Sequence, residues 1–160
     1  MEQIELPATT DRSAIWRSLV PQVKGLLHDE NDLIAAMANV SAALMQAFSW
    51  HWIGFYRVIG NELVLGPFQG PIACTRIGFG KGVCGSAWEQ RRTLIVPDVE
   101  QFPGHIACSR FSRSEIVVPI MNGTGEVTGV LDIDSAQLDE FNEEDAMHLR
   151  GFCELLSHCH

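Results

Sequence analysis

Apolar side chains recur at helical spacing near the N-terminus and again after it. Residues 33–48 place them at a 3.6-residue period, the pattern of an amphipathic helix, with Asp29 or Asn31 available as its N-cap. Residues 15–27 show the same period, but Pro21 removes a backbone donor in the middle. The first segment is therefore predicted to form two short helices or one kinked helix.

Further along the chain, the pattern changes to short segments rich in β-branched and aromatic residues, separated by turn sequences. The predicted hairpins comprise residues 51–58 with 62–68, and 115–121 with 126–134. Shorter elements are predicted between them, namely a helix at residues 83–90, a strand at 93–96 and a loop at 99–114. A last helix follows Asn142, which has Asp145 at the capping-box position. Helices at both termini around a mostly antiparallel sheet predict an α+β sandwich.

Length and charge narrow the class of protein. A chain of 160 residues with 46% hydrophobic residues suits one compact domain, 1–160, in which residues 1–30 form a helical segment packed on the rest. A net charge of −9 repels phosphate backbones and anionic lipids, so neither nucleic acid nor a membrane is an expected partner. No signal peptide or membrane-spanning run is evident, and we expect a cytoplasmic protein.

Five cysteines cannot all pair within one chain, and structural disulfides are rare in a reducing compartment. Cys74, Cys84 and Cys108 lie outside the periodic core patterns, and arginines stand near Cys74 and Cys108. Cys84 is at a predicted helix start, where the helix dipole is expected to lower the pKa of a thiol. These three cysteines are the candidates for redox chemistry, and on these grounds alone Cys84 would attack with Cys108 as its partner.

The alternative is that free cysteines act as small, buried, inert hydrophobes. That interpretation suits Cys153 on the apolar face of the last helix. Cys159 lies between His158 and His160, and a frayed terminus is expected there rather than a metal ligand. No spacing among the cysteines matches a zinc ribbon, and no metal or other cofactor is expected.

Carboxylates and aromatic residues suggest a small ligand. Asp132 and Asp134 share one face of a predicted strand, and Glu115 opens its neighbour, so at least one of the three pKa values should rise and supply a proton. Trp52 and Tyr56 flank the side-chain-free Gly54, which predicts a slot for a methyl group. Alternatively, the aromatics belong to the core and the aspartates to a solvated strand end.

Four segments taken in order resemble the free methionine-(R)-sulfoxide reductases, which are single GAF domains. They read Trp52-Ile53-Gly54-Phe55-Tyr56, Gly66-Pro67-Phe68-Gln69-Gly70, Gly80-Lys81-Gly82-Val83-Cys84-Gly85 and Leu131-Asp132-Ile133-Asp134-Ser135, with Ala107-Cys108-Ser109 in addition. The resemblance covers about Leu33 to Leu156. It implies a six-stranded antiparallel sheet with helices on one side, and a small cavity closed by the loop before Cys108.

The resemblance also implies roles for the candidate residues. Cys108 would attack the sulfoxide sulfur of free methionine sulfoxide, and Cys84 or Cys74 would resolve the sulfenic acid that results. Trp52 and Tyr56 would hold the substrate methyl, while the acids would bind its ammonium group and sulfoxide oxygen. These acids are Glu115, Asp132 and Asp134. Thioredoxin is the expected reductant, no bound cofactor is required, and the sequence leaves open whether the chain forms a homodimer.

The resemblance therefore reverses the order of attack that local context suggested for Cys84 and Cys108. Two other classes of function stay open from the sequence. One is a non-catalytic GAF sensor of a small ligand, and the other is a thiol switch that reports oxidants without processing a sulfoxide. The acids and the aromatic slot argue against a simple switch, which needs neither.

Overall fold

The computed structural model describes residues 3–106, 108 and 110–160. Within them the chain forms α1 (Arg12–Leu27), α2 (Leu33–Phe48), β1 (Trp52–Ile59), β2 (Glu62–Gln69), β3 (Arg76–Gly78), α3 (Gly82–Gln90), β4 (Leu94–Val96), the 3-10 helix η1 (Val99–Gln101), β5 (Ser114–Met121), β6 (Val127–Ser135) and α4 (Glu143–Leu156).

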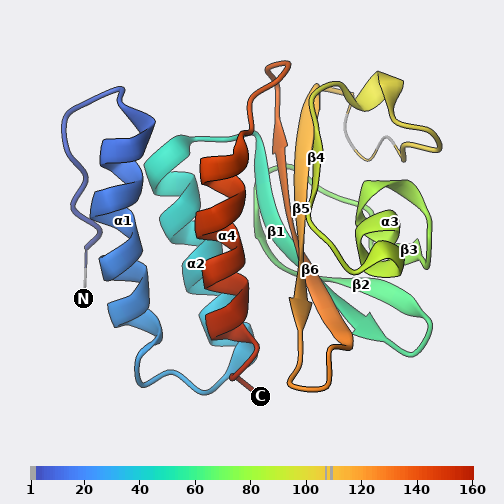
Figure 1. Cartoon of the computed structure of the whole chain (residues 1–160), viewed down its shortest axis with the longest axis horizontal. Helices are drawn as coiled ribbons and strands as arrows, with labels where there is room; N and C mark the ends of the chain where they lie inside the picture. Colours follow the sequence, from blue (N-terminus) through green and yellow to red (C-terminus); the bar gives the residue numbers. More distant parts are fainter. Residues whose placement is uncertain (1–2, 107, 109) are drawn as a thin grey trace.

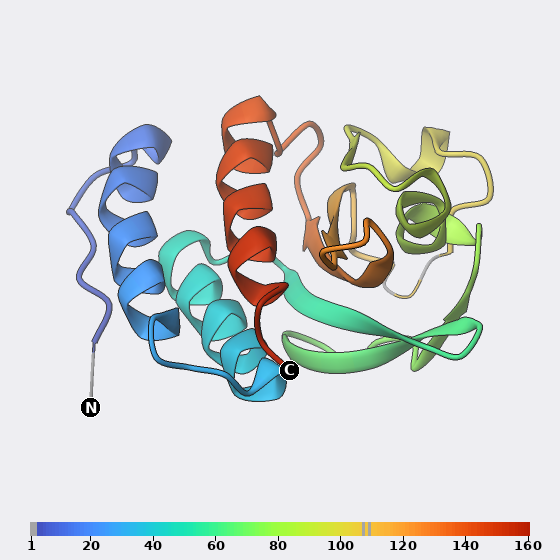
Figure 2. The same cartoon turned by 60° about the horizontal axis from the view of Figure 1, so that its bottom comes forward.

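The strands form a six-stranded sheet in the order β3-β2-β1-β6-β5-β4, and all neighbouring pairs are antiparallel. Helices α1, α2 and α4 form a layer on one side of the sheet, while α3 lies on the other (Figures 1 and 2). This arrangement confirms the predicted α+β fold. It corrects the expectation that all helices lie on one side, because α3 buries Val83 and Ala87 in a second core with Val117 and Val130.

Most predicted elements are present, with local differences. Helix α2 has the predicted bounds, but its N-cap is Asp32, whose carboxylate accepts a hydrogen bond from the Ala35 amide at 2.9 Å, rather than Asp29 or Asn31. Pro21 lies inside one continuous α1. The capping box of Asn142 with Asp145 is confirmed. Among the described residues, no helix has both the length and the apolar content needed to cross a membrane.

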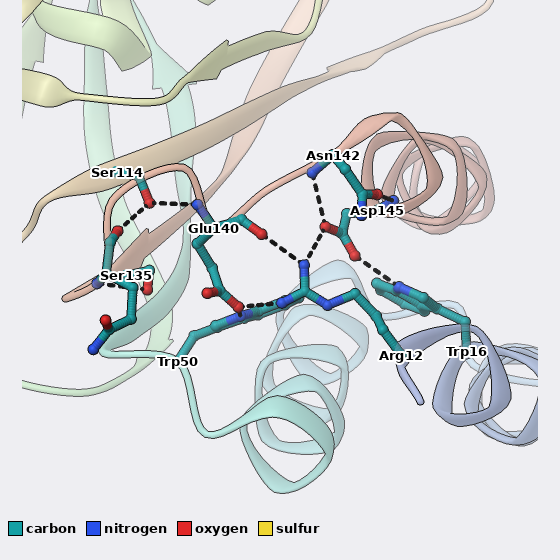
Figure 3. Close-up of polar contacts among 9 residues, drawn as sticks. Arg12, Trp16, Trp50, Ser114, Ser135, Glu140, Asn142 and Asp145 are labelled. Atoms are coloured by element: carbon teal, nitrogen blue, oxygen red, sulfur yellow. Dashed lines mark hydrogen bonds and ion pairs between the residues drawn. The ribbon is translucent and has the colours of Figure 1, made fainter. Parts of the chain in front are cut away.

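A polar cluster attaches α1 to the start of α4 (Figure 3). The fully buried carboxylate of Asp145 accepts hydrogen bonds from the Trp16 indole at 2.8 Å and from the Arg12 guanidinium at 2.9 Å. Arg12 also donates to the Glu140 carbonyl and pairs with the Glu140 carboxylate, which accepts from the Trp50 indole at 3.0 Å. Because each partner comes from a distant part of the chain, the cluster fixes α1 against the body of the protein.

We propose that residues 1–160 fold as one unit, in which α1 is a structural part. Asp145→Ala leaves the Arg12 and Trp16 donors without their acceptor, so the free energy of unfolding should fall by about 2 to 4 kcal/mol. Urea denaturation followed by circular dichroism measures this loss. Glu143→Ala is the matched control. Glu143 lies in the same first turn of α4, two residues before Asp145, but its side chain is 83% exposed, so the substitution should change stability little. An equal effect of the two variants would contradict the role of the cluster.

Candidate active site

Two of the three candidate cysteines form a disulfide. Cys74, in the loop between β2 and β3, is bonded to Cys108, in the loop before β5, 34 residues further along. The Tyr56 hydroxyl donates a hydrogen bond to the Cys74 carbonyl at 2.9 Å and so ties the first loop to β1. Cys108 is exposed, as its polar loop predicted, and Cys74 is half-buried. Ala107 and Ser109, which carry part of the resemblance, lie outside the described residues.

The third cysteine has a different environment. Cys84 lies in the first turn of α3, is only 4% exposed, and places its sulfur 4.0 Å from a Glu115 carboxylate oxygen. Burial raises the pKa of this thiol well above its usual value, and the nearby Asp132 and Glu115 carboxyls raise it further. The expectation that the helix start lowers this pKa is therefore wrong. The desolvation of a thiolate and the repulsion by the carboxylates outweigh the helix dipole.

The predicted acid cluster is assembled by strand register. Glu115 on β5 is paired with Asp134 on β6. Asp132 lies two residues before Asp134, on the same face of β6. Burial is the main cause that raises the pKa of each of the three carboxyls well above its usual value, and repulsion within the cluster adds to it. One buried oxygen, Oδ1 of Asp132, has no hydrogen-bond partner among the described residues. The cluster can therefore retain protons at neutral pH.

The structure adds His105 to the site. Its Nε2 atom lies 3.6 Å from a carboxylate oxygen of Glu115, and its side chain is 15% exposed. Burial lowers the pKa of the imidazole, which favours its neutral form. One signal for this residue is visible in the sequence, since it is the titratable side chain nearest to Cys108 on its N-terminal side within the long polar loop. Its distance from Glu115 depends on the fold.

Trp52 and Tyr56 form an aromatic wall, but they do not flank an open slot. Their ring centroids are 5.9 Å apart, and Trp52 also stacks on Phe68 at 5.3 Å. The Trp52 ring lies over Gly54, where an added Cβ would come within 2.5 Å of the indole. The predicted space above Gly54 is therefore filled by the indole itself, and the glycine is required for this close approach. Any apolar group of a ligand would contact the outer surface of the wall.

These features meet at one cavity of about 40 Å³. All but one of the predicted site residues line it, namely Trp52, Tyr56, Cys84, Cys108, Glu115, Asp132 and Asp134. Cys74 reaches it through the bond to Cys108. His105 and Lys81 also line the cavity, so each brings a side chain that can carry positive charge to a site rich in carboxyls.

The fold and the cavity define a class of protein: a GAF domain whose cavity combines buried acids with a cysteine pair. The family model for the GAF domain matches residues 28–159. A GAF domain-containing protein A from Dictyostelium discoideum is 58% identical over 142 residues, covering 88% of this chain and 89% of that protein.

Two further comparisons narrow the class. The free methionine-R-sulfoxide reductase of Escherichia coli is 41% identical over 141 residues, covering 88% of this chain and 85% of that enzyme. The structure of the free methionine-R-sulfoxide reductase of Neisseria meningitidis with its substrate is 48% identical and superposes with a TM-score of 0.94. The match covers 98% of this chain and 94% of that one. The chain belongs to the free methionine-R-sulfoxide reductase family of GAF domains.

The contrast between the cysteines generates a prediction about thiol reactivity. In the protein with the Cys74–Cys108 disulfide intact, Cys84 should react with a thiol-specific reagent much more slowly than the half-exposed Cys159, because Cys84 is buried and its pKa is raised well above the usual value, while the pKa of Cys159 is also raised but its sulfur is accessible. Kinetics of thiol modification in native buffer, with mapping of the modified peptide, measure both rates. Cys84→Ser should leave the fast phase unchanged and Cys159→Ser should remove it, whereas the reverse pattern would contradict the environment described for Cys84.

Proposed function

We propose that this chain reduces free methionine (R)-S-oxide to methionine, with Cys108 as the attacking thiol, Cys74 as the resolving thiol and thioredoxin as the reductant. The observation that carries the proposal is the Cys74–Cys108 disulfide at a cavity that also contains three buried acids. The substrate is supported by the Escherichia coli and Neisseria meningitidis relatives, both of which are free methionine-R-sulfoxide reductases.

The substrate is placed by matching its groups to the cavity wall. Its S-methyl group is proposed to contact the outer surface of the aromatic pair Trp52 and Tyr56, which are both nearly fully buried. The ammonium group lies among Glu115, Asp132 and Asp134, where its positive charge favours the ionised form of some of these carboxyls. Repulsion among three carboxylates still favours one proton within the cluster. That proton is the one available to the sulfoxide oxygen.

In the first step, the Cys108 thiolate of the reduced enzyme attacks the substrate sulfur. The neutral acid of the cluster protonates the sulfoxide oxygen, which makes the S–O bond easier to break. The oxygen passes to Cys108, methionine leaves, and Cys108 becomes a sulfenic acid. The substrate sulfur gains two electrons and the cysteine sulfur loses two.

In the second step, the Cys74 thiol attacks the sulfenic sulfur of Cys108, a disulfide forms, and water leaves. This product has the same connectivity as the disulfide in the structure, which is why we assign resolution to Cys74 rather than to Cys84. An external dithiol then supplies two electrons and two protons to regenerate both thiols. Thioredoxin is proposed for this step, since the expected cytoplasmic location keeps it reduced.

Cys84 is proposed to remain a thiol throughout this cycle. Its sulfur is buried beside Glu115, and its raised pKa disfavours the thiolate that resolution would need. The exposed position of Cys108 instead suits attack by an external dithiol on the disulfide.

The cysteine assignments predict distinct yields of methionine per chain. Wild-type protein given dithiothreitol should convert the R but not the S sulfoxide of free methionine, with many turnovers. Cys108→Ser should yield no methionine, because the attacking thiol is absent. Cys74→Ser should release about one methionine per chain with thioredoxin and then slow at least about tenfold, because the sulfenic acid is not resolved. Chromatography of released methionine measures all three yields.

Cys84→Ser is the matched control, since it removes a thiol that lines the same cavity. It should retain turnover with thioredoxin and still form the Cys74–Cys108 disulfide, seen by mass spectrometry of thiol-blocked peptides. A stall after one methionine in Cys84→Ser, with unimpaired turnover in Cys74→Ser, would contradict the assignment. Failure of the wild-type protein to reduce either sulfoxide would leave the sensor function as the better explanation of the cavity.

The acid cluster predicts how the rate depends on pH. The acids act in their protonated form, and their raised pKa values keep that form present to higher pH than in an ordinary carboxyl. The single-turnover rate should therefore fall as pH rises through the pKa of the cluster, and also fall at low pH as the Cys108 thiolate is lost. Rapid-quench measurement of released methionine tests this profile. A rate that only rises with pH, following the thiolate alone, would contradict an acid step.

A further inference from the structure

Three buried side chains, one thiol and two carboxylates, converge on one point of the cavity. The sulfur of Cys84, one carboxylate oxygen of Glu115 and one of Asp132 lie within 4.8 Å of one another. The three residues come from α3, β5 and β6, so the fold brings them together rather than a local motif. The proposed ammonium group of a substrate accounts for the carboxylates. It does not account for a thiol at the same point.

A second observation concerns the Asp132 side chain, which belongs to this group of donors. The Asp132 side chain belongs to a residue that is 6% exposed, and its Oδ1 atom is buried without a hydrogen-bond partner among the described residues. A buried oxygen that lacks a donor costs about 1 to 3 kcal/mol. Because Asp132 also lines the cavity, an ion or molecule in the cavity can reach this side chain.

We propose that Cys84, Glu115 and Asp132 form a binding site for a zinc-class divalent ion. Zinc takes thiolate sulfur and carboxylate oxygen at about 2.0 to 2.3 Å, which separates tetrahedral ligands by about 3.3 to 3.8 Å. The Cys84 sulfur and a Glu115 oxygen are 4.0 Å apart, and the group as a whole spans up to 4.8 Å, so the three side chains must move closer together to bind an ion. Binding releases the Cys84 thiol proton to solvent, together with any proton on the coordinating carboxylates, and forms one metal–sulfur bond.

The chemistry of the donors selects the ion. A thiolate ligand favours zinc, cobalt or cadmium over magnesium and calcium, which prefer oxygen alone. His105 lies outside the group of three, although its Nε2 atom is 3.6 Å from a Glu115 oxygen. Three protein ligands with a fourth position facing a cavity is the arrangement of an open zinc site. An ion at this site would occupy the place proposed above for the substrate ammonium group, and this consequence alone rests on the proposed function.

Cobalt is the probe, because a cobalt–thiolate bond gives a charge-transfer band and a tetrahedral site gives visible absorption. Oxidised protein is used under anaerobic conditions, so that Cys74 and Cys108 stay paired and cannot bind the ion. We expect one Co²⁺ per chain with a thiolate band, displaced by one equivalent of Zn²⁺. Cys84→Ser should abolish the band, and Asp132→Asn should weaken binding by about tenfold or more, the loss typical of disturbing even outer ligands.

The remaining thiols provide controls within the same chain. Cys153→Ser removes a buried thiol that contacts the Val118 carbonyl, and Cys159→Ser removes the half-exposed thiol between two histidines. Both variants should keep the band. Circular dichroism melting checks that each variant is folded, and Asp132→Asn provides the test if Cys84→Ser does not fold. A band that survives Cys84→Ser or disappears in Cys159→Ser would overturn the proposal, as would unchanged affinity in Asp132→Asn or no Co²⁺ binding at millimolar concentration.

Discussion

The enclosure of several acidic groups in one wall of a cavity is the constraint on which the rest of the site depends. Glu115, Asp132 and Asp134 are brought together by the antiparallel pairing of β5 with β6, and burial disfavours the ionised form of each. An isolated charge in such a place would be strongly destabilising. The raised pKa values favour the neutral form of these groups, and a carboxyl that is neutral at neutral pH can donate its proton to a bound oxygen. The same desolvation thus creates both the energetic problem and the chemical capacity.

The two faces of the sheet divide the requirements of stability and chemistry. On the face covered by α1, α2 and α4, the core contains large apolar residues from all three helices and from the sheet, and the cluster around Asp145 anchors the outermost helix (Figure 3). On the other face, α3 and the loops leave room for the cavity. A well-packed face can compensate for an opposite face that contains three buried acids, a free thiol and an Asp132 oxygen without a hydrogen-bond partner among the described residues. Helix α1 therefore contributes to the site through the stability of the domain, although none of its residues is among the described residues that line the cavity.

Sequence patterns predicted the features that depend on near neighbours. The period of residues 33–48, the capping box of Asn142 with Asp145 and the two long hairpins follow from local spacing, and the structure confirms them. The rise in the pKa of the acids also followed, because alternation along β6 places Asp132 and Asp134 on one face. Features set by tertiary contacts were not predictable. Strand β3 has three residues and no pattern of its own.

The environment of Cys84 shows why the pKa of its thiol could not be predicted from the local sequence. The first turn of α3 is visible in the sequence, and it argues for a reactive thiolate. Only the fold reveals that Glu115 on β5 and Asp132 on β6 surround the same sulfur. In a buried place, desolvation and two carboxyls outweigh the partial charge of a helix end. For Cys108 the local sequence was sufficient, because its polar loop predicts exposure and the structure shows an exposed residue.

Strand β1 links the aromatic wall, the acids and the disulfide into one geometry. Gly54 pairs with Asp132 across the β1–β6 ladder, and its missing side chain lets the Trp52 ring lie against the backbone at that level. Two residues further on, Tyr56 continues the wall and donates its hydroxyl hydrogen to the Cys74 carbonyl. One strand thereby sets the distance from the wall to the acids and the position of the loop that holds the cysteine bonded to Cys108. A side chain at position 54 would displace Trp52 and thus the wall, although Gly54 contributes no chemical group to the site.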